Sequence, residues 1–450
     1  MLAMTSEQLL SHLVTTTNRY LNDELSSTCW VAYSGGLDSH VLLHALSFVR
    51  EQLHAKLQAV HIEHGLQQDA QAWPMHCQQV CDSLNVPLTI IKVNAKAAGG
   101  DSPEAAARFA RYQAFANLLQ PAEILLAAQH KHDQAETLML QLLRGAGSRG
   151  QSAMPEVSEL GEGQLIRPLL VASQESLNHY ANEQKLQWIE DPSNRDSKFD
   201  RNFLRHEIMP AMRKRWPSVD STLSRVANLQ AETEQLLGEL ASSDLTTIGD
   251  ANKHLVIAEL LKLSAERQRN VLRYWLHTQG MRLPSERKLR QVQTDMLMAN
   301  EDKNPCVAWD GAELRRYRGH LYAMRPLTAI DPKTTLSWQP EQILTLPGET
   351  GCLHGRAIQG QGISAKMMAT EVISVMYRQG GEQIQPQGRD HHHSLKKLFQ
   401  EAGIPTWQRD RTPLLYIAGE LAAIPGLCVS DSHAAAEGMA GVVIEWQQPE

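Results

Sequence analysis

The sequence is poor in cysteine, it lacks long apolar runs, and it has no excess of basic residues. Its 450 residues include six cysteines, and none of them forms a Cys-x-x-Cys pair. Cys77 and Cys81 lie four residues apart, a spacing that suits neighbours on a helix better than metal ligands. No run approaches the roughly 18 apolar residues of a membrane helix, and no secretory signal precedes the first domain. We therefore expect a cytoplasmic protein with reduced thiols and no membrane partner.

The charge balance limits the claims that can be made about nucleic acid. The formal net charge is −7, so any RNA-binding surface must come from local basic patches rather than from the whole chain. Hydrophobic residues make up 42% and charged residues 21%, as in an ordinary globular protein with an ample core. The length predicts about three domains.

The first half of the sequence alternates short apolar strands with amphipathic helices. We expect strands at 29–33, 57–62, 88–93 and 124–128, and helices at 41–51, 69–84, 102–119 and 133–143. This α/β pattern predicts a parallel sheet with helices on both faces, in which ligands bind beyond the carboxyl ends of the strands. Ser34, His61 and His130 all lie at predicted strand ends, so we expect them to converge on one crevice.

The pattern changes after residue 216. Long helices are predicted at 219–240, 265–279 and 285–297, followed by strands at 306–309 and 313–318 and a Pro- and Thr-containing linker at 326–340. The last part mixes strands (372–377, 414–417, 421–423, 442–446) with a helix at 394–402. We therefore predict an N-terminal nucleotide-binding domain (1–216), a mainly helical domain (217–325), the linker, and a small α+β C-terminal domain (341–450).

The segment Ser34-Gly35-Gly36-Leu37-Asp38-Ser39 lies between a predicted strand and a predicted helix. Glycines let backbone N–H groups point inward, and a helix N-terminus adds partial positive charge, so the segment is typical of a phosphate site. No Gly-Lys-Ser/Thr follows, which excludes the Walker pattern. A Gly-rich turn without a ligand is the weaker alternative.

A second segment, from Ala128 to Thr137, begins at a strand end and enters a helix. Asp133 and Glu136 are three residues apart and share one helical face. Two carboxylates in a first turn either complement the helix dipole or bind a cationic group or Mg²⁺. Beside a phosphate loop, the binding role is favoured.

Local basic clusters are the candidates for RNA contacts. Arg108 and Arg111 share a helical face, and the stretch 201–210 contributes Arg201, Asn202 and Arg205. Such side chains contact phosphates and base edges, although Arg108 and Arg111 could equally be surface partners of acidic residues. A further basic cluster lies in the helical middle region, where an RNA-facing surface and a solvated helix face are equally good interpretations. Another lies in the tail, where Lys396 and Lys397 accompany Arg389, Arg409 and His391 to His393.

Taken together, these segments resemble the bacterial tRNA(Ile)-lysidine synthetase family of the PP-loop ATP pyrophosphatase superfamily. The shared motifs run in the family order and are densest over 29–210: the SGGLDS loop, His64-Gly65-Leu66, EAAARFARY at 104–112, HKHDQAET at 130–137, Arg144-Gly145, Arg167-Pro168-Leu169-Leu170, and the Glu190-Asp191 block followed by RNFLRHEIMP at 201–210. The resemblance resumes at 394–399, 404–410 and 413–415. Two positions depart from the family pattern: His132 stands where an Asp is usual, and Gln67 where an Arg is usual.

The resemblance implies a ligase that uses ATP and Mg²⁺ to join L-lysine to the wobble cytidine of a minor isoleucine tRNA with a CAU anticodon. The cytosine 2-oxygen is first adenylated with release of pyrophosphate, and the lysine ε-amine then displaces AMP. The modified base pairs with A instead of G, so the codon that is read changes from AUG to AUA. A homodimer is possible.

The resemblance also implies roles for individual residues. ATP would be bound by Ser34, Gly35, Gly36, Leu37, Asp38, Ser39, His61, His64 and His130. Asp38, a metal ligand, and Arg111 would be catalytic, and Asp133 and Glu136 would bind lysine. The tRNA would be bound by Arg108, Arg144, Arg201, Asn202, Arg205, Lys396, Lys397 and Arg409.

Three other functions are alternatives to this one. A tRNA thiolase of the same superfamily commonly uses a Cys pair, and this chain lacks Cys-x-x-Cys. A glutamine-dependent amidotransferase such as GMP synthetase would need a glutaminase domain, for which no nucleophile motif is evident. A non-catalytic RNA-binding protein that senses ATP would release no pyrophosphate, which an assay with tRNA and lysine would reveal.

Overall fold

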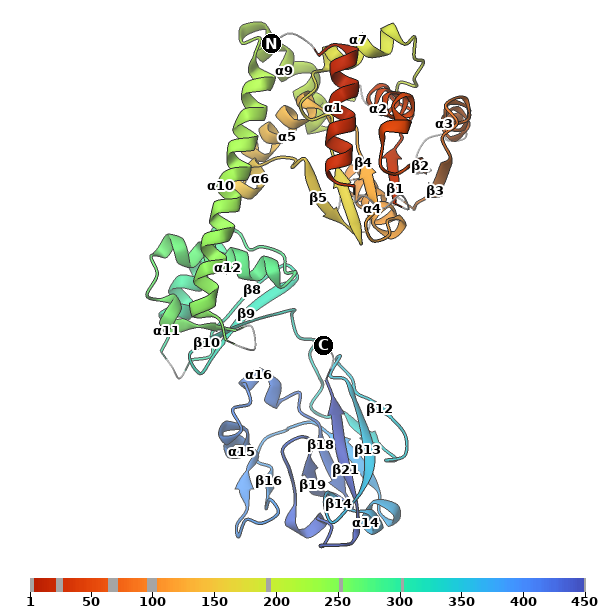
Figure 1. Ribbon diagram of the computed structural model, residues 1–450. Coiled ribbons are helices and arrows are strands. Elements are labelled where there is room, and N and C mark those ends of the chain that lie inside the picture. The colour runs from red at the N-terminus through yellow and green to blue at the C-terminus, as the bar shows by residue number, and fades with distance from the viewer. Residues whose placement is uncertain are drawn as a thin grey trace. The chain divides into compact units, whose positions relative to one another are not determined.

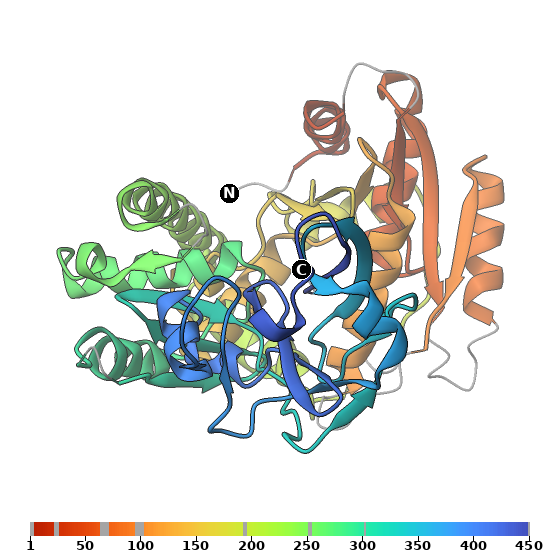
Figure 2. The same cartoon turned by 90° about the horizontal axis from the view of Figure 1, so that it is seen from below.

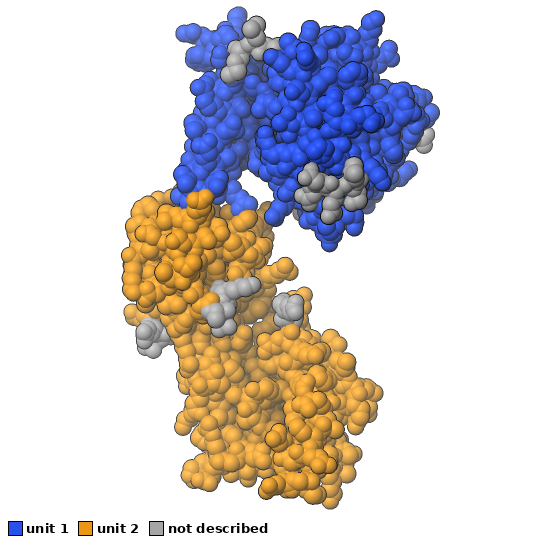
Figure 3. All heavy atoms as spheres, viewed as in Figure 1, with its two compact units in different colours: residues 1–237 blue, residues 238–450 orange. Residues whose placement is uncertain are grey.

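The computed structural model describes residues 4–21, 27–63, 72–94, 103–191, 196–250, 254–300 and 303–448. It divides into two compact units, Met1–Leu237 and Gly238–Glu450, which Figure 3 shows in different colours. The boundary falls inside the 30-residue helix α10 (Val219–Ile248), not at the predicted position near residue 216.

A six-stranded sheet forms the centre of the first unit, in the order β3-β2-β1-β4-β6-β5. Its strands are β1 (Thr28–Ala32), β2 (Lys56–Glu63), β3 (Leu88–Lys92), β4 (Ile124–Leu126), β5 (Val157–Leu160) and β6 (Gly163–Ile166). All neighbouring pairs are parallel except β5 and β6, which form an antiparallel hairpin at one edge. The strand order reverses at β1, which lies between β2 and β4, and such a reversal opens a crevice at the carboxyl ends of the strands.

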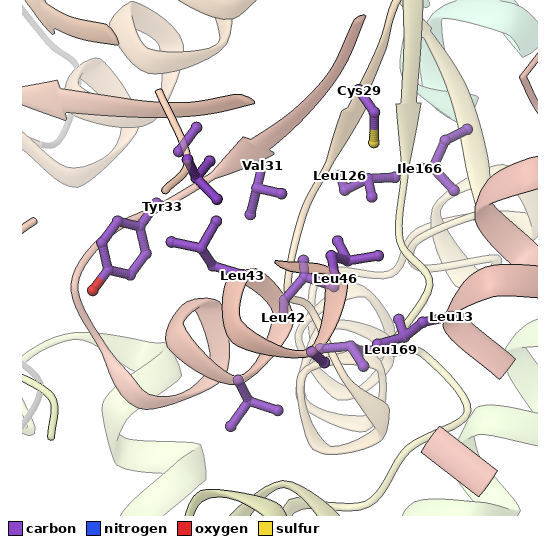
Figure 4. Close-up of a cluster of buried hydrophobic side chains, with 14 of the residues drawn as sticks. Leu13, Cys29, Val31, Tyr33, Leu42, Leu43, Leu46, Leu126, Ile166 and Leu169 are labelled. Carbon is purple, nitrogen blue, oxygen red and sulfur yellow. The ribbon is translucent and has the colours of Figure 1, made fainter. Parts of the chain in front are cut away.

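Helices cover both faces of this sheet, as predicted (Figures 1 and 2). They are α1 (Ser6–Arg19), α2 (Leu37–Phe48), α3 (Ala72–Ser83), α4 (Pro103–Leu118), α5 (Lys131–Leu143), α6 (Ser148–Gln151), α7 (Gln174–Glu183), α8 (Asp200–Phe203) and α9 (Met209–Arg215), with a π-helical turn at Leu204–Ile208 and a 3-10 turn at Arg50–Gln52. One core lies between the sheet and helices α1, α2, α3 and α7, and another lies under α4. Figure 4 shows Val31 and Leu126 of the sheet facing Leu42 and Leu46 of α2 in the first core.

The alternation of side chains along β1 explains these two cores. Cys29 and Val31 point into the first core, whereas Trp30 belongs to the core under α4. A strand that is apolar on both faces is typical of a parallel sheet with two helical layers. This packing fixes the carboxyl end of β1, from which the Gly-rich loop continues.

In the part of the second unit that the structure describes, the strands form four small sheets. Their strands are β7 (Leu255–Val256), β8 (Cys306–Trp309), β9 (Ala312–Tyr317), β10 (His320–Met324), β11 (Thr335–Ser337), β12 (Leu344–Thr345), β13 (Cys352–Gln359), β14 (Ile363–Ser364), β15 (Ile373–Met376), β16 (Gln383–Ile384), β17 (His393–Ser394), β18 (Leu414–Ile417), β19 (Glu420–Ile424), β20 (Cys428–Val429) and β21 (Ala440–Gln447). Its shorter helices are α11 (Ile257–Leu260), α12 (Ala265–Thr278), α13 (Glu286–Gln291), α14 (Ala365–Thr370), α15 (Leu395–Glu401) and α16 (Thr406–Arg409), with a π-helical turn at Val292–Leu297 and a 3-10 turn at Asp431–His433.

One prediction about this half is wrong in part. The predicted linker at 326–340 contains β11, which pairs with β15, and Trp338, which is buried in the core of the C-terminal sheets. Apolar side chains at alternate positions override the Pro and Thr signals there. The predicted helix 285–297 is confirmed, since Ser285 caps α13 and α13 continues directly into the π-helical turn Val292–Leu297.

Two further findings concern the chain as a whole. All six cysteines are free thiols, as the lack of Cys-x-x-Cys led us to expect. Within the residues that the structure describes, no helix is long and apolar enough to cross a membrane.

Candidate active site

The carboxyl ends of β1, β2 and β4 border a cleft of about 1010 Å³ in the first unit. Most of the predicted site residues of this unit line it: Ser34, Gly36, Leu37, Asp38, Ser39, His61, Arg108, Arg111, Asp133, Arg201, Asn202 and Arg205. These residues are up to 171 positions apart in the sequence. The predicted convergence of Ser34 and His61 is confirmed, and His130 lies buried behind the cleft wall, where it contacts Asp38.

The Gly-rich loop joins β1 to α2 in a single tight turn. Ser34 and Ser39 bond to each other across it: the Ser34 N–H donates to Ser39 Oγ at 3.2 Å, and the two hydroxyls are 3.0 Å apart. Ser39 Oγ also donates to the Gly36 carbonyl. The Ile189 N–H donates to the Gly35 carbonyl at 3.0 Å, so a distant segment holds the loop from the other side.

The loop leaves backbone donors at the start of α2. The helix begins at Leu37, four residues earlier than predicted, so Asp38 and Ser39 belong to its first turn. Gly36 is the N-cap residue and has no side chain to accept a hydrogen bond from that turn. Helix N-terminal N–H groups without such a cap suit an anion, because the helix dipole adds to their partial positive charge. The loop therefore fits the phosphates of a nucleotide.

Gly35 is the position where the turn requires glycine. Its φ is +84°, and an added Cβ would lie 3.2 Å from Cys77 Sγ and 3.3 Å from Trp73 Cδ1. Gly36 has a φ of −82°, and its added Cβ would make ordinary van der Waals contacts, with Ser34 Oγ at 3.5 Å and the Ile189 carbonyl oxygen at 4.0 Å. The two neighbouring glycines therefore differ in their tolerance of a side chain.

We expect Gly35→Ala to lower the free energy of unfolding by about 2 kcal/mol, because a non-Gly residue in this backbone region is strained. Gly36→Ala is the matched control, and its stability should stay near that of the wild type. Urea denaturation of the three proteins measures the difference. Equal losses for both variants would contradict this account of the turn.

Asp38 presents a carboxylate to the cleft that is held at both oxygens. Gln174 Nε2 donates to Oδ1 at 3.0 Å, and His130 Nε2 lies 3.6 Å from Oδ2. The side chain remains 36% exposed. A carboxylate has about four lone-pair positions, so two remain for a cation or a substrate group.

The donor set can be compared with what Mg²⁺ requires. Among the described residues, no group of three or more His, Cys, Asp or Glu side chains is arranged to hold a metal ion. Mg²⁺ in nucleotide sites is commonly bound by one or two carboxylates together with substrate phosphates and water. Asp38, in the first turn of α2 at the end of the phosphate loop, fits that kind of site, and it does not fit a closed site made by the protein alone.

His130 is the N-cap residue of α5 and is almost completely buried. Its Nδ1 accepts the backbone N–H of His132 at 3.2 Å, which assigns the ring proton to Nε2. Nε2 lies 3.4 Å from Asp133 Oδ2 and 3.6 Å from Asp38 Oδ2. Burial alone would lower the pKa of His130, but the carboxylates of Asp133 and Asp38 outweigh it and raise that pKa.

Asp133 and Glu136 form a cluster with Arg201 and Arg205. Arg201 donates to Asp133 Oδ1 at 2.9 Å and to Glu136 Oε2 at 3.1 Å, and Arg205 donates to the same two carboxylates at 2.8–2.9 Å. Glu136 is only 1% exposed. Burial opposes ionisation of Asp133, but His130 and the two guanidinium groups lower its pKa below the usual value. The two carboxylates and two guanidinium groups balance each other in formal charge.

This cluster changes the interpretation of the predicted lysine ligands. Asp133 Oδ1 accepts from both arginines, and Oδ2 accepts the His130 N–H at 3.1 Å and faces His130 Nε2. Four donors occupy its lone-pair positions, and Glu136 does not line the cleft. Direct contact of lysine with both carboxylates, as the sequence predicted, therefore does not fit this conformation. Likewise, Arg201 and Arg205 are not free RNA ligands, because they are bonded within the cluster.

The remaining predicted residues of the first unit have varied surroundings. His61 is buried within β2, its Nδ1 lies 2.9 Å from the Tyr33 carbonyl, and burial lowers its pKa. The Arg108 guanidinium stacks over the Tyr112 ring at 4.9 Å. Arg144 is exposed as the C-cap residue of α5, away from the cleft lining. His64 and Gln67 lie outside the described residues.

His132, the departure from the family pattern, does not line the cleft. Its Nε2 lies 3.4 Å from Asp220 Oδ2 in the first turn of α10, and Arg213 donates two hydrogen bonds to the same carboxylate. Burial lowers the pKa of His132. The substitution therefore affects the contact between α5 and α10 and leaves the cleft lining unchanged.

The predicted tRNA residues of the second unit differ in accessibility. Lys396 and Lys397 are exposed on α15. Arg409 is only 6% exposed, and it donates to the Ile404 carbonyl at 2.8 Å and to the Tyr317 hydroxyl at 3.1 Å. The prediction that Arg409 contacts tRNA is therefore wrong for this conformation, because its guanidinium ties α16 to β9.

Several residues of the site carried no sequence signal. Gln174 reaches Asp38 from the start of α7, 136 positions away, and no motif marked it as part of the site. Trp73, Trp188 and Ile189 line the cleft beside the loop. The Trp188–Ile189 pair could have been found from its position directly before the Glu190-Asp191 block.

Comparisons with known proteins agree with this arrangement. Models of three protein families match the chain: "PP-loop domain" over 9–212, "TilS substrate binding domain" over 255–322, and "TilS substrate C-terminal domain" over 373–446. A curated protein of Coxiella burnetii named tRNA(Ile)-lysidine synthase is 44% identical over 99% of this chain and 97% of its own length. Proteins of the same name from Methylococcus capsulatus and Yersinia pestis are 43% and 40% identical, each over 93% of this chain and 96% and 94% of their own lengths.

Proposed function

Because this chain belongs to the tRNA(Ile)-lysidine synthase family, we propose that it joins L-lysine to the wobble cytidine of the isoleucine tRNA with a CAU anticodon. The observation that carries the proposal is that the Gly-rich loop, the uncapped start of α2 and the Asp38 carboxylate lie in one cleft. The Coxiella burnetii relative aligns with 99% of this chain, so the similarity includes both units. ATP, lysine and tRNA are all cytoplasmic molecules, and we propose that the protein works there.

The proposed reaction has two steps. In the first, the 2-oxygen of cytosine attacks the α-phosphorus of ATP, a P–O bond forms, and pyrophosphate leaves. In the second, the lysine ε-amine attacks carbon 2 of the base, the C–O bond breaks, AMP leaves, and the amine loses its proton to solvent or a base. The change in base pairing moves decoding from AUG to AUA.

The residues of the cleft suit the first step. The backbone N–H groups at the start of α2, together with Ser34 and Ser39, would hold the departing pyrophosphate, which the absence of a side-chain cap on α2 supports. Asp38 would hold Mg²⁺, which offsets the charge that grows on the phosphates when it is bound. Arg111, which also lines the cleft, would contact the α-phosphate or the base, and Arg108 is another lining residue.

For lysine, we propose a site beside the Asp133–Glu136–Arg201–Arg205 cluster. Asp133 is the carboxylate of this cluster that lines the cleft. Glu136 does not line it and accepts hydrogen bonds from the two arginines. Because the formal charges of the cluster cancel, it admits a cationic substrate only while both carboxylates are ionised. Arg201, Asn202 and Arg205 also line the cleft.

The decisive experiment combines the protein with ATP, Mg²⁺, radiolabelled lysine and total tRNA. Label should appear in tRNA, and one pyrophosphate should be released for each lysine incorporated. Omission of lysine should leave at most the adenylated intermediate. ATP binding without pyrophosphate release would instead favour a non-catalytic RNA-binding protein, and transfer of sulfur would favour a thiolase.

A separate prediction concerns Lys396 and Lys397, exposed on α15 in a chain of net charge −7. If they contact tRNA phosphates, Lys396→Ala with Lys397→Ala should raise the KM for tRNA and reduce the salt slope of binding by about 1–2. The constants for lysine and ATP should not change. Filter binding across a salt series measures this, with Lys262→Ala as an exposed control on another element. An unchanged slope would leave α15 as an ordinary solvated helix.

A further inference from the structure

Gln174 lies at the first position of α7, outside every motif of the sequence, yet its amide reaches the cleft. Its Nε2 donates to Asp38 Oδ1 at 3.0 Å. A carboxylate can only accept, so the amide nitrogen must face Asp38. His130 approaches the other oxygen of the same carboxylate. Asp38 is therefore held at one oxygen by α7 and at the other by α5.

The start of α7 is a rigid base for this contact. Ser173 caps the helix by accepting the Ser176 N–H, and Leu177, Tyr180 and Ala181 are buried in the core. The Tyr180 hydroxyl lies 3.0 Å from His44 Nδ1 on α2, the helix that carries Asp38. Two packed helices thus fix the distance between Gln174 and Asp38.

One backbone hydrogen bond also links the segment before α7 to the start of α5. The Lys131 N–H donates to the Ala172 carbonyl at 3.1 Å, directly before α7 begins. The first turns of α2, α5 and α7 therefore meet around one carboxylate. Side chains held on packed helices are positioned more exactly than side chains on loops.

From this geometry we infer that Gln174 is a positioning residue, which fixes the orientation of the Asp38 carboxylate toward the phosphate loop. The expected effect on kcat rests on the proposed function, whereas the expected effect on Tm rests on the Gln174–Asp38 contact alone. The amide is neutral, so it orients the carboxylate and leaves its charge available to a cation.

The kinetic test compares two substitutions of similar size. Gln174→Met removes the donor, and Gln174→His can retain one at its Nε2. We expect Gln174→Met to lower kcat for lysine transfer about 10- to 100-fold, with the KM for lysine within about twofold, because small misplacements of a reacting group are costly. Gln174→His should keep most of the activity. Wild-type turnover in Gln174→Met, or equal losses in both variants, would overturn the inference.

A second arm does not depend on catalysis. Gln174→Glu places a carboxylate against the Asp38 carboxylate, and the two like charges repel each other in the folded protein. The Tm of Gln174→Glu at pH 8 should therefore fall a few degrees below that of the wild type.

The control for this arm is Asn178→Asp, an exposed amide-to-acid change on the same helix. Its Tm at the same pH should stay near that of the wild type. A Gln174→Glu melting profile identical to that control would exclude the contact with Asp38. If the wild-type protein transfers no lysine, the proposed function fails, while the melting profiles still test the Gln174–Asp38 contact.

Discussion

Replacement of Asp38 with asparagine should lower the turnover for lysine transfer about 10³-fold, equivalent to about 4 kcal/mol of transition-state stabilisation. Asparagine keeps the shape of the side chain and an oxygen that can accept from Gln174, so the hydrogen bond there survives. It removes the negative charge that faces the phosphate loop and that Mg²⁺ would need. The loss should therefore appear in kcat rather than in the fold.

Asp82→Asn, on the exposed surface of α3, is the matched control and should keep wild-type turnover and Tm. Steady-state assays and thermal melting of the three proteins separate catalysis from stability. Turnover of Asp38→Asn near that of the wild type would remove Asp38 from the chemistry. A large fall in its Tm would instead show that the carboxylate is mainly structural.

Much of the first unit could be predicted from the sequence, because its signals are local. The alternation of apolar strands and helices gave β1, β2, β3 and α5 within a few residues, and the Gly pair marked the phosphate loop. The edge hairpin of β5 and β6 was missed, since its short strands are only partly apolar. The start of α2 was placed too late because Leu37 to Ser39 looked like loop residues, whereas the glycine turn lets the helix begin at once.

The site was harder to predict than the fold, because side-chain pairing depends on residues far apart in the sequence. The prediction that Asp133 and Glu136 share one helical face is confirmed. What this face can bind depends on Arg201 and Arg205, which lie 65–72 positions later in the sequence and donate hydrogen bonds to both carboxylates. Arginine usually lies on the surface, yet Arg409 is buried and donates hydrogen bonds to the Tyr317 hydroxyl and the Ile404 carbonyl. A local pattern identifies charged residues but not their partners.

The Asp133–Glu136–Arg201–Arg205 cluster provides the second large prediction. Glu136→Gln keeps the side-chain shape but changes the formal charge of the cluster from zero to +1. Arg201 and Arg205 would then both depend on Asp133, and a positive cluster would repel the ammonium groups of lysine. We expect the KM for lysine to rise at least about 10-fold, with the KM for ATP within about twofold. Removal of one partner from a buried pair should also lower stability by about 3 kcal/mol.

Arg201→Met is the control of opposite sign, because it changes the cluster charge to −1 while Arg205 still bridges both carboxylates. Its KM for lysine should stay level or fall, and its KM for tRNA should rise if Arg201 also faces the RNA. Initial rates measured against lysine, ATP and tRNA separately, with urea denaturation of each variant, distinguish these effects. Equal increases in the KM for lysine and ATP in Glu136→Gln would point to a general loss of the cleft. A rise in the KM for lysine in both variants would mean that cluster geometry, rather than its charge, controls lysine binding.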